Sequence, residues 1–401
     1  MRDGLKRLFI LVFSSLLFTI LFCSLVVADE TVSAVFPAFN STNIQAFQIN
    51  GNAALSGSSL RLTPALGNQA GSAFWSQKIF LPSNRSFSAY FSFKISSSGG
   101  GGADGIVFVI QPQSNTAGSS GGGLGFEGIN NSFGVEFDTY LNSAPTSDIN
   151  ANHIGIDGSS PNGKGNVTSL ASRDVSTINS SWVLDDSAEY HAWIDYNGTN
   201  KSVEVRLNRY NNTRPAVSHL NYTINLGDVF PTDVYIGFSA ATGGAWNNHD
   251  ITSFYFNNEV INQGINLNTT SYLMAPFRLN IYSQFTNITA NGWNRSEIYV
   301  NATDINNATL ANQLISFSTT SGIISPGSAT TNSTGGALNT LISSHNYAVA
   351  TVRATAVGGA FADINVTFNH LSTIPEWSDI GLMAVLVMVI SGYIVINKKV
   401  D

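Results

Sequence analysis

Short runs of alternating apolar and polar residues fill the sequence from about Val35 to Asn258, and Gly, Asn and Ser separate them. They include SLRLTP, SFSAYFSFKI, FGVEFDTY, YHAWIDY, SVEVRLN, DVYIGFSA and ITSFYFNN. Alternation at period two, rich in β-branched and aromatic residues, predicts strands with one buried face. The run GIVFVI is apolar on both faces, so it predicts a central strand between two layers. So many strands without a helical pattern predict a β-sandwich.

A second all-β region follows, from about Ser283 to Asn369. It resembles the invasin-type bacterial Ig-like domain over nearly its full length. That resemblance implies a smaller β-sandwich that acts as a spacer and carries no chemistry. The residues that carry the resemblance are Val300, Phe317, Gly322, Ile324, Pro326, Gly335, Ala337, Leu341, Ala350, Val352 and Ala354.

The composition supports packed domains and excludes one class of partner. Of 401 residues, 43% are apolar and 11% are charged, which is enough apolar material for two or three domains. The net charge is −7, and only 18 Lys and Arg residues are spread over the whole chain. Because nucleic-acid binding requires clustered cations that neutralise phosphates, we expect no nucleic-acid partner.

The N-terminal residues 1–28 have the parts of a secretory signal peptide. Basic residues precede a long apolar stretch that ends at Val27, and Ala28 is a candidate cleavage site. The apolar stretch, about twenty residues, is also long enough for an uncleaved anchor. The only cysteine, Cys23, lies inside this segment, so a mature exported chain would contain no disulfide.

The C-terminal residues 374–401 have the pattern of an anchor. Seventeen largely apolar residues, Ile380 to Ile396, precede Lys398 and Lys399. Such a helix is about 26 Å long, near the lower limit for spanning a membrane, and the lysines place its end in the cytoplasm. With its Pro-Glu-Trp start, the tail also resembles the PEF-type sorting signals of archaeal and bacterial surface proteins. Two interpretations stay open: a permanent single span, or a tail that is cleaved and exchanged for a lipid.

Potential glycosylation sites are frequent between these ends. Roughly sixteen Asn-x-Ser/Thr sequons occur, Asn301 and Asn365 among them. Together with the two termini they predict a glycosylated protein on the extracellular face of the cell membrane. The expected fold is all-β. It consists of a larger sandwich and a smaller one, with a hydrophobic helix at each end of the chain.

The stretch VEFDTYLNSAPTSDINANHIGID, from Val135 to Asp157, gathers potential metal ligands. Glu136 and Asp138 are two apart on one predicted strand, so both side chains point to the same face, about 7 Å apart along the strand. Two carboxylates on one face need a counter-charge. The ligand types suit two neighbouring ions that share Asp138 and Asp148. A transition metal such as Mn²⁺ suits Glu136, Asp138, Asp148 and His153, and Ca²⁺ suits Asp138, Asp148, the amide of Asn142 and the carbonyl of Tyr140.

The same stretch resembles the metal-binding signature of the legume (L-type) lectins. GGADGIVFVIQP, SSGGGLGFEG and VYIGFSAATGGAWNNHDITSFYFNNE resemble three other hallmark segments of that family, in the family's order, over about 220 residues in all. The resemblance implies a concanavalin-like (jelly-roll) β-sandwich. It also implies Mn²⁺, or another transition metal, and Ca²⁺ on the residues just named, and no enzymatic activity.

The resemblance further implies a carbohydrate site that binds glycans or glycoproteins. In the family an Asp after a cis Ala-Asp peptide, a Gly N–H, the Ca²⁺-binding Asn and an aromatic ring hold the sugar. Ala103–Asp104, Gly123, Asn142 and Tyr140 occupy those places, and the loop after FSAATG adds Gly244 and Ala245 as backbone donors. Two departures affect the metal loop. The gap from Asn142 to Asp148 is one or two residues longer than in the plant proteins, and Ile149 replaces their usual Pro.

The expected domains are a signal peptide at 1–28, an L-type lectin domain at 33–259, a linker at 260–281, an Ig-like stalk at 282–370 and an anchor at 374–401. Within the lectin region we interpret Asp157, Asp195 and His249 as structural. We expect a Ca²⁺/Mn²⁺-dependent surface lectin or adhesin. Because a single site binds weakly, self-association would strengthen its attachment to a surface.

Two other functions fit parts of the sequence. A structural surface-layer protein that has lost sugar binding is one. A glycoside hydrolase of related architecture is the other, because paired carboxylates on a strand also serve those enzymes. The laminarinase-type pattern needs a Glu three residues after the Asp, and Leu141 stands there.

Overall fold

The computed structural model describes residues 30–32, 34–118, 123–143, 148–159, 167–258, 272–274, 278–304, 307–356 and 359–370. The predicted signal peptide and anchor lie outside these residues. Within them the chain is all-β, and the helices are short 3-10 turns at Asn43–Ala46, Val175–Thr177 and Leu226–Asp228. No helix of the described part is long and apolar enough to cross a membrane.

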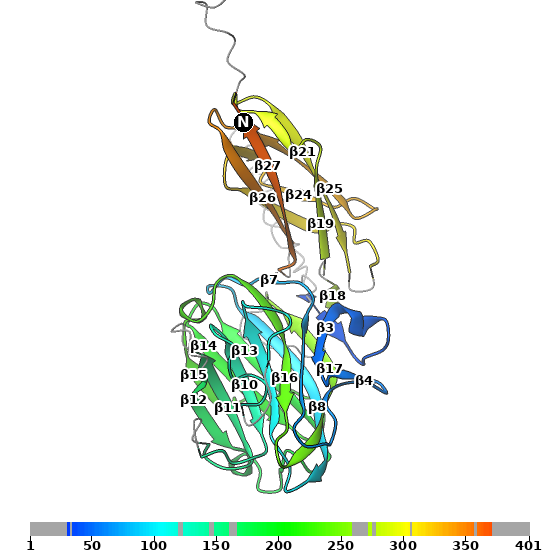
Figure 1. Cartoon of the computed structure of the whole chain (residues 1–401), viewed down its shortest axis with the longest axis vertical. Coiled ribbons are helices and arrows are strands. Elements are labelled where there is room, and N and C mark those ends of the chain that lie inside the picture. Colours follow the sequence, from blue (N-terminus) through cyan, green and yellow to red (C-terminus); the bar gives the residue numbers. More distant parts are fainter. Residues whose placement is uncertain are drawn as a thin grey trace, which may run out of the picture.

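The first sandwich consists of two large sheets, as Figure 1 shows. Among the described residues one sheet has the order β12-β11-β10-β9-β16-β6-β3, with β7 beside β16. Its strands are β3 (Phe47–Gly51), β6 (Ala70–Trp75), β7 (Ile79–Phe80), β9 (Gly105–Gln111), β10 (Phe133–Asp138), β11 (His153–Ser159), β12 (Val167–Asp174) and β16 (Asp233–Ala241).

The second sheet covers the first. Its order is β15-β14-β13-β8-β17-β5-β4, with β2 beside β17. Its strands are β2 (Ala34–Phe36), β4 (Ala54–Ser56), β5 (Ser59–Thr63), β8 (Phe87–Gly99), β13 (Glu189–Asn197), β14 (Ser202–Asn208), β15 (Leu220–Thr223) and β17 (Trp246–Asn257). A parallel pair, β1 (Glu30–Val32) with β18 (Tyr272–Met274), joins the two ends of this region.

Aromatic rings from both sheets fill the core between them. Phe238 of β16 lies 5.0 Å from Phe91 of β8 and 5.1 Å from Phe254 of β17, measured between ring centroids. Strand β9 lies between β10 and β16, and all seven of its residues are buried. The prediction of a central strand at GIVFVI is therefore confirmed. Apolar and polar side chains alternate along the flanking strands, so the polar ones point away from this core.

The second sandwich is smaller and has its own core. Its sheets have the orders β19-β21-β25-β23 and β20-β27-β26-β22-β24 in the described chain. The strands are β19 (Arg278–Ser283), β20 (Asn287–Thr289), β21 (Arg295–Thr303), β22 (Leu314–Thr319), β23 (Ile323–Ser325), β24 (Ser328–Thr330), β25 (Gly336–Ile342), β26 (Ala348–Ala356) and β27 (Phe361–Asn369). Strands β18 and β19 begin inside the stretch 260–281 that the sequence suggested as linker.

Direct contacts join the two sandwiches at one place. Ile79 forms a β-bridge with Ala360, and the N–H of Phe80 donates to the carbonyl of Gly359 at 2.7 Å. Arg353 of β26 donates to Asp233 at the start of β16 at 2.8 Å. Figure 1 shows β7 at the end of the first sandwich that faces the second. The smaller sandwich is therefore docked against the larger one.

Strand β16 runs from this junction to the opposite end of the first sandwich. It begins at Asp233, beside the junction, and ends at Ala241, whose carbonyl accepts the N–H of Asp104 at 3.0 Å. Nine strand residues span about 27 Å. Asp104 therefore lies at the end of the sandwich remote from the Ig-like region.

The junction should depend on Gly359. Its φ is +92°, and a Cβ there would lie 2.6 Å from the amide nitrogen of Asn258 and 3.0 Å from the carbonyl of Phe80. Gly128 has a similar φ of +89° but open space around it, so it is a matched control for backbone strain. We expect Gly359→Val, and not Gly128→Val, to broaden the small-angle X-ray scattering distance distribution of residues 30–370. Equal profiles for the two variants would contradict a docked junction.

Candidate functional site

Two paired strands bring the predicted metal ligands together. In the antiparallel β10–β11 pair, Asp138 lies opposite His153 and Glu136 lies opposite Gly155. Because side chains alternate along a strand, Val135 and Phe137 enter the core while Glu136 and Asp138 point to the other face. A Cβ at Gly155 would lie 2.2 Å from the Glu136 carboxylate, so the glycine makes room for that group.

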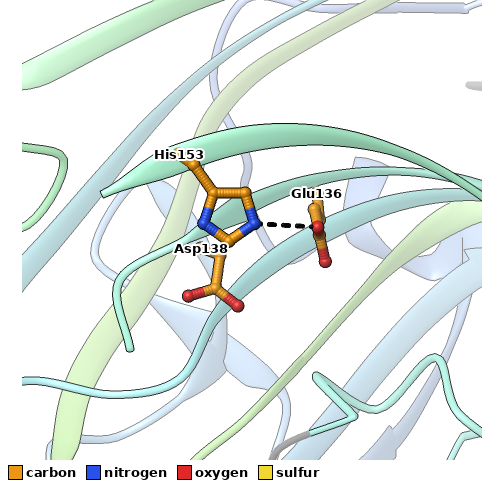
Figure 2. A group of neighbouring side chains, drawn as sticks. All are labelled: Glu136, Asp138 and His153. Carbon is orange, nitrogen blue, oxygen red and sulfur yellow. Dashed lines mark hydrogen bonds and ion pairs between the residues drawn. The ribbon is translucent and has the colours of Figure 1, made fainter. Parts of the chain in front are cut away.

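Glu136, Asp138 and His153 form a compact buried group, drawn in Figure 2. Each offers a ligand atom, and these atoms all lie within 4.8 Å of one another. The three residues are 4%, 2% and 1% exposed. His153 Nδ1 lies 2.8 Å from the carbonyl of Asn150 and Nε2 lies 3.1 Å from Glu136. A proton on Nδ1, donated to Asn150, leaves Nε2 as the nitrogen that can bind a metal.

The loop after β10 is fastened by its own carboxylates. Asp138 accepts the N–H of Tyr140 at 2.6 Å, and Asp148 accepts the N–H of Asn142 at 2.6 Å. Asp148 is half-buried at this loop, and residues 144–147 between them lie outside the described part. The buried amide oxygen of Asn142 has no hydrogen-bond partner among the described residues. An orphaned acceptor beside clustered carboxylates is what a hard cation such as Ca²⁺ requires.

The charges of the group also fit a cation. Burial, and then the charge of Glu136, raise the pKa of Asp138 well above its usual range. Burial lowers the pKa of His153, but the hydrogen bond and charge of Glu136 outweigh this effect and the pKa is raised. Buried carboxylates in contact either bind protons or need a positive charge among them. A metal ion would supply that charge, so the residues present fit one.

A second set of predicted residues lies next to this group. The carbonyl of Asp104 accepts the N–H of Thr139 at 2.9 Å, which ties Asp104 to the end of β10. The Ala103–Asp104 peptide bond is cis, as the family resemblance implied. Asp104 is only 3% exposed, and its Oδ2 has no hydrogen-bond partner among the described residues. Burial raises the pKa of this carboxyl to about 6.

Two glycine-containing turns lie near Asp104. A Cβ at Gly243 would lie 3.8 Å from Asp104 Oδ2, which places the loop of Gly244 and Ala245 beside the carboxyl. Gly244 is exposed with open space around it, and Ala245 is buried. The carbonyl of Gly123 accepts the N–H groups of Phe126 and Glu127 at 2.8 and 3.0 Å, and this turn packs Leu124 against Gly105.

Two aromatic residues near the site differ in their surroundings. Tyr140 is 41% exposed. Trp246 packs its indole over Gly99, where a Cβ would lie 2.3 Å from Nε1. Tyr140, and not Trp246, is therefore the ring available to a ligand.

Asn247 positions the Asp104 loop, and the sequence contains no local signal for this role. It is fully buried, and its amide oxygen accepts the N–H of Ala103 at 2.7 Å. A lone Asn in a strand has no recognisable spacing to a partner 144 residues away. The contact depends on the pairing of β8 with β17, which only the folded chain shows.

The residues interpreted as structural have internal partners. Asp195 accepts hydrogen bonds from Ser88, Arg206 and Arg214. His249 Nδ1 lies 2.6 Å from the hydroxyl of Thr63, and burial lowers its pKa to about 3. Asp157 is fully buried on the same side of β11 as His153, and burial and the charge of Glu136 raise its pKa. Asp157 is therefore a further carboxyl beside the candidate metal ligands, and its burial favours the neutral, protonated form.

The stabilisation that metal binding gives should increase with pH. The pKa of Asp104 is raised from 3.8 to about 6, and Asp138 and Asp157 are raised as well. A raised folded-state pKa contributes stability that is complete below pH 3.8 and is lost as the pH rises through about 6. Metal binding needs the deprotonated forms and follows the opposite trend.

We therefore expect the rise in melting temperature that Ca²⁺ and Mn²⁺ produce to be larger at pH 7 than at pH 5. Burial lowers the pKa of His249 to about 3, which shifts stability in the opposite direction to the raised carboxyls, but it does so equally with and without metal. Scanning calorimetry in four samples checks this difference. A rise of the same size at both pH values would show that these carboxyls do not bind metal.

Comparison with known proteins places this geometry in a family. Residues 31–271 match the legume lectin domain, and residues 279–369 match the bacterial Ig-like domain (group 1). A lectin of Lens culinaris subsp. tomentosus is 31% identical over 268 residues, which are 63% of this chain and 92% of the lectin. The solved lectin II of Ulex europaeus is 24% identical and covers 58% of this chain and 100% of that chain, with a TM-score of 0.47.

Other relatives match this chain over a smaller part of their length. The L-type lectin-domain containing receptor kinase VIII.1 of Arabidopsis thaliana is 36% identical over 179 residues, 43% of this chain and 23% of the kinase. The chain thus spans about a quarter of that relative's length. No enzyme family is indicated for the chain. The match to the family covers more than half of the residues, and the chain therefore belongs to the legume lectin domain family.

Proposed function

We propose that the first sandwich binds carbohydrate in a manner that depends on Ca²⁺ and a transition metal such as Mn²⁺. The observation that carries the proposal is the buried carboxyl of Asp104, whose Oδ2 has no hydrogen-bond partner among the described residues and lies beside the turn of Gly243. Its backbone is tied to the strand that bears Asp138. A carboxylate with an open acceptor accepts hydrogen bonds from two vicinal hydroxyls, which suits a neutral sugar.

Specific residues would hold the two ions. Glu136, Asp138, Asp148 and His153 suit Mn²⁺, and Asp138, Asp148, Asn142 and the Tyr140 carbonyl suit Ca²⁺. The ions would neutralise the clustered carboxylates and hold the loop that presents Asn142 and Tyr140. Asp104 then accepts sugar hydroxyls, Gly123, Gly244 and Ala245 offer backbone N–H groups, and the exposed Tyr140 ring covers an apolar face of the sugar. No covalent step is involved.

The sugar class can be found with immobilised monosaccharides. Residues 30–370 contain both hydrophobic cores. This protein, loaded with Ca²⁺ and Mn²⁺, should be retained on at least one resin of a set that displays mannose, glucose, galactose, N-acetylglucosamine and N-acetylgalactosamine. EDTA and the free monosaccharide should both elute it. If the metal-loaded protein passes through every resin, the lectin proposal fails and the function of a structural surface protein takes its place.

We further propose that the chain is a cell-surface lectin or adhesin. The apolar termini at 1–28 and 374–401 and the many sequons support this proposal. The position of Asp104 supports it too, because the site is remote from the docked Ig-like sandwich that leads to the C-terminus. Protease treatment of intact cells that carry the chain should remove its sugar-binding activity. Sugar-binding activity that resists the protease on intact cells and is lost only after lysis would contradict surface display.

A further inference from the structure

The outer face of one sheet in the Ig-like sandwich carries an unusual row of large side chains. Tyr282 of β19, Tyr299 of β21 and Leu338 of β25 are cross-strand neighbours in register. They are 59%, 42% and 49% exposed. A solvated sheet face ordinarily carries polar residues at such positions, so a row of two rings and a Leu points to a ligand.

A groove runs beside this row. Its volume is about 530 Å³, and its lining includes Tyr282, Tyr299 and Leu338 on one side. Asn301 and Gly336, paired across β21 and β25, contribute to the next row, where Gly336 has no side chain to fill the space. The turn from Asn332 to Gly336 forms the other side.

The walls of the groove are ordered before any ligand arrives. The amide oxygen of Asn332 accepts the N–H groups of Thr334 and Gly336, each at 2.9 Å. The amide nitrogen of Asn301 donates to the carbonyls of Gly335 and Thr334 in the side-chain orientation that gives both amide atoms hydrogen-bond partners. The hydroxyl of Tyr299 donates to Glu297 on the same strand, which orients the ring. A preorganised site loses less entropy when it binds.

The lining selects the chemistry of the ligand. It combines phenol rings and an apolar Leu with amides and a Thr hydroxyl, and among the described residues no Lys, Arg, Asp, Glu or His lines it. A phosphate would find no opposite charge there, and Glu297 is already engaged by the hydroxyl of Tyr299. A pyranose ring has an apolar C–H face for the tyrosines and hydroxyls for the amides. We propose that this groove is a second, metal-independent binding site for a neutral glycan.

Two sources of such a glycan must be separated. Asn301-Ala302-Thr303 and Asn332-Ser333-Thr334 are sequons beside the groove, so the chain's own N-linked sugar is one source and a glycan of another molecule is the other. Protein from a host without N-glycosylation can bind only the second. In protein from a glycosylating host, an attached sugar over the groove would protect Tyr282 and Tyr299 from iodination, which mass spectrometry detects.

The test uses residues 30–370 with Asp104→Ala, which removes the proposed lectin site, in EDTA and without N-glycosylation. On an array of neutral oligosaccharides we expect residual binding that Tyr282→Ala and Tyr299→Ala each weaken by at least about tenfold. Tyr347→Ala, an equally exposed tyrosine outside the groove, should leave binding unchanged.

Two results would overturn the proposal. One is the absence of array binding together with equal iodination of Tyr282 and Tyr299 in protein from both hosts. The other is a dimer in sedimentation that both tyrosine variants abolish without any glycan binding, which would make this face an interface between copies. Failure of the Asp104 site alone leaves the prediction for this groove intact, because the assay is run without that site.

Discussion

Asp104→Asn should lower the affinity for the bound monosaccharide by at least about 100-fold. Hydrogen bonds to a charged acceptor contribute about 1.5–3 kcal/mol each, so loss of the charge facing two hydroxyls removes about 3 kcal/mol or more. The Asn side chain keeps the shape but turns one acceptor into a donor. Isothermal titration with the retained sugar measures the change.

Two controls separate binding from folding in this variant. Burial disfavours the charged form of Asp104, whose pKa is raised to about 6, so the variant should melt at the same temperature as the parent or higher. Asp233→Asn changes an acid at the far end of β16, the strand whose other end accepts the N–H of Asp104, and should keep full affinity. An Asp104→Asn protein that binds sugar like the parent would remove Asp104 from the site.

Removal of metal should produce the second large effect, a fall in melting temperature of about 8–16 °C. A ligand present at about 1,000 times its dissociation constant stabilises the folded state by about 4 kcal/mol, and each kcal/mol shifts a domain of this size by about 2–4 °C. Asp138→Asn should show no response to added metal, because Asp138 is one of the two carboxylates that both ions are proposed to share. Scanning fluorimetry with and without EDTA measures these shifts.

Tyr140→Ala is the matched variant for this experiment. Its proposed metal ligand is the backbone carbonyl, which the substitution preserves, while the exposed ring is lost. We expect the full metal response with weakened sugar binding. If Asp138→Asn keeps the metal response of the parent, the ions bind elsewhere or not at all.

Much of the fold follows from local patterns in the sequence. Period-two alternation places side chains on two faces regardless of what the strand pairs with, so the strands around Phe91 and Phe238 were predictable. The strand around Val107 was predictable from a run that is apolar on both faces. The order of strands was not, because it depends on contacts between distant segments. The β1–β18 pair joins residues some 240 positions apart and lies partly in the stretch predicted as linker.

The candidate site, too, could be predicted only where local patterns determine it. Glu136 and Asp138 share a face because they are two apart, but their approach to His153 depends on the register of β10 against β11. Gly155 matters because Glu136 lies opposite it, and Asn247 matters because β17 runs beside β8. These roles come from pairing, which a single sequence does not contain. The junction at Gly359 has the same origin.

A crystal structure of the protein soaked with Ca²⁺, Mn²⁺ and the retained monosaccharide tests the central claim most directly. Anomalous scattering should place Mn²⁺ among Glu136, Asp138, Asp148 and His153, with the sugar hydroxyls on Asp104. Metal density away from these residues, or a sugar bound without contact to Asp104, would contradict the account.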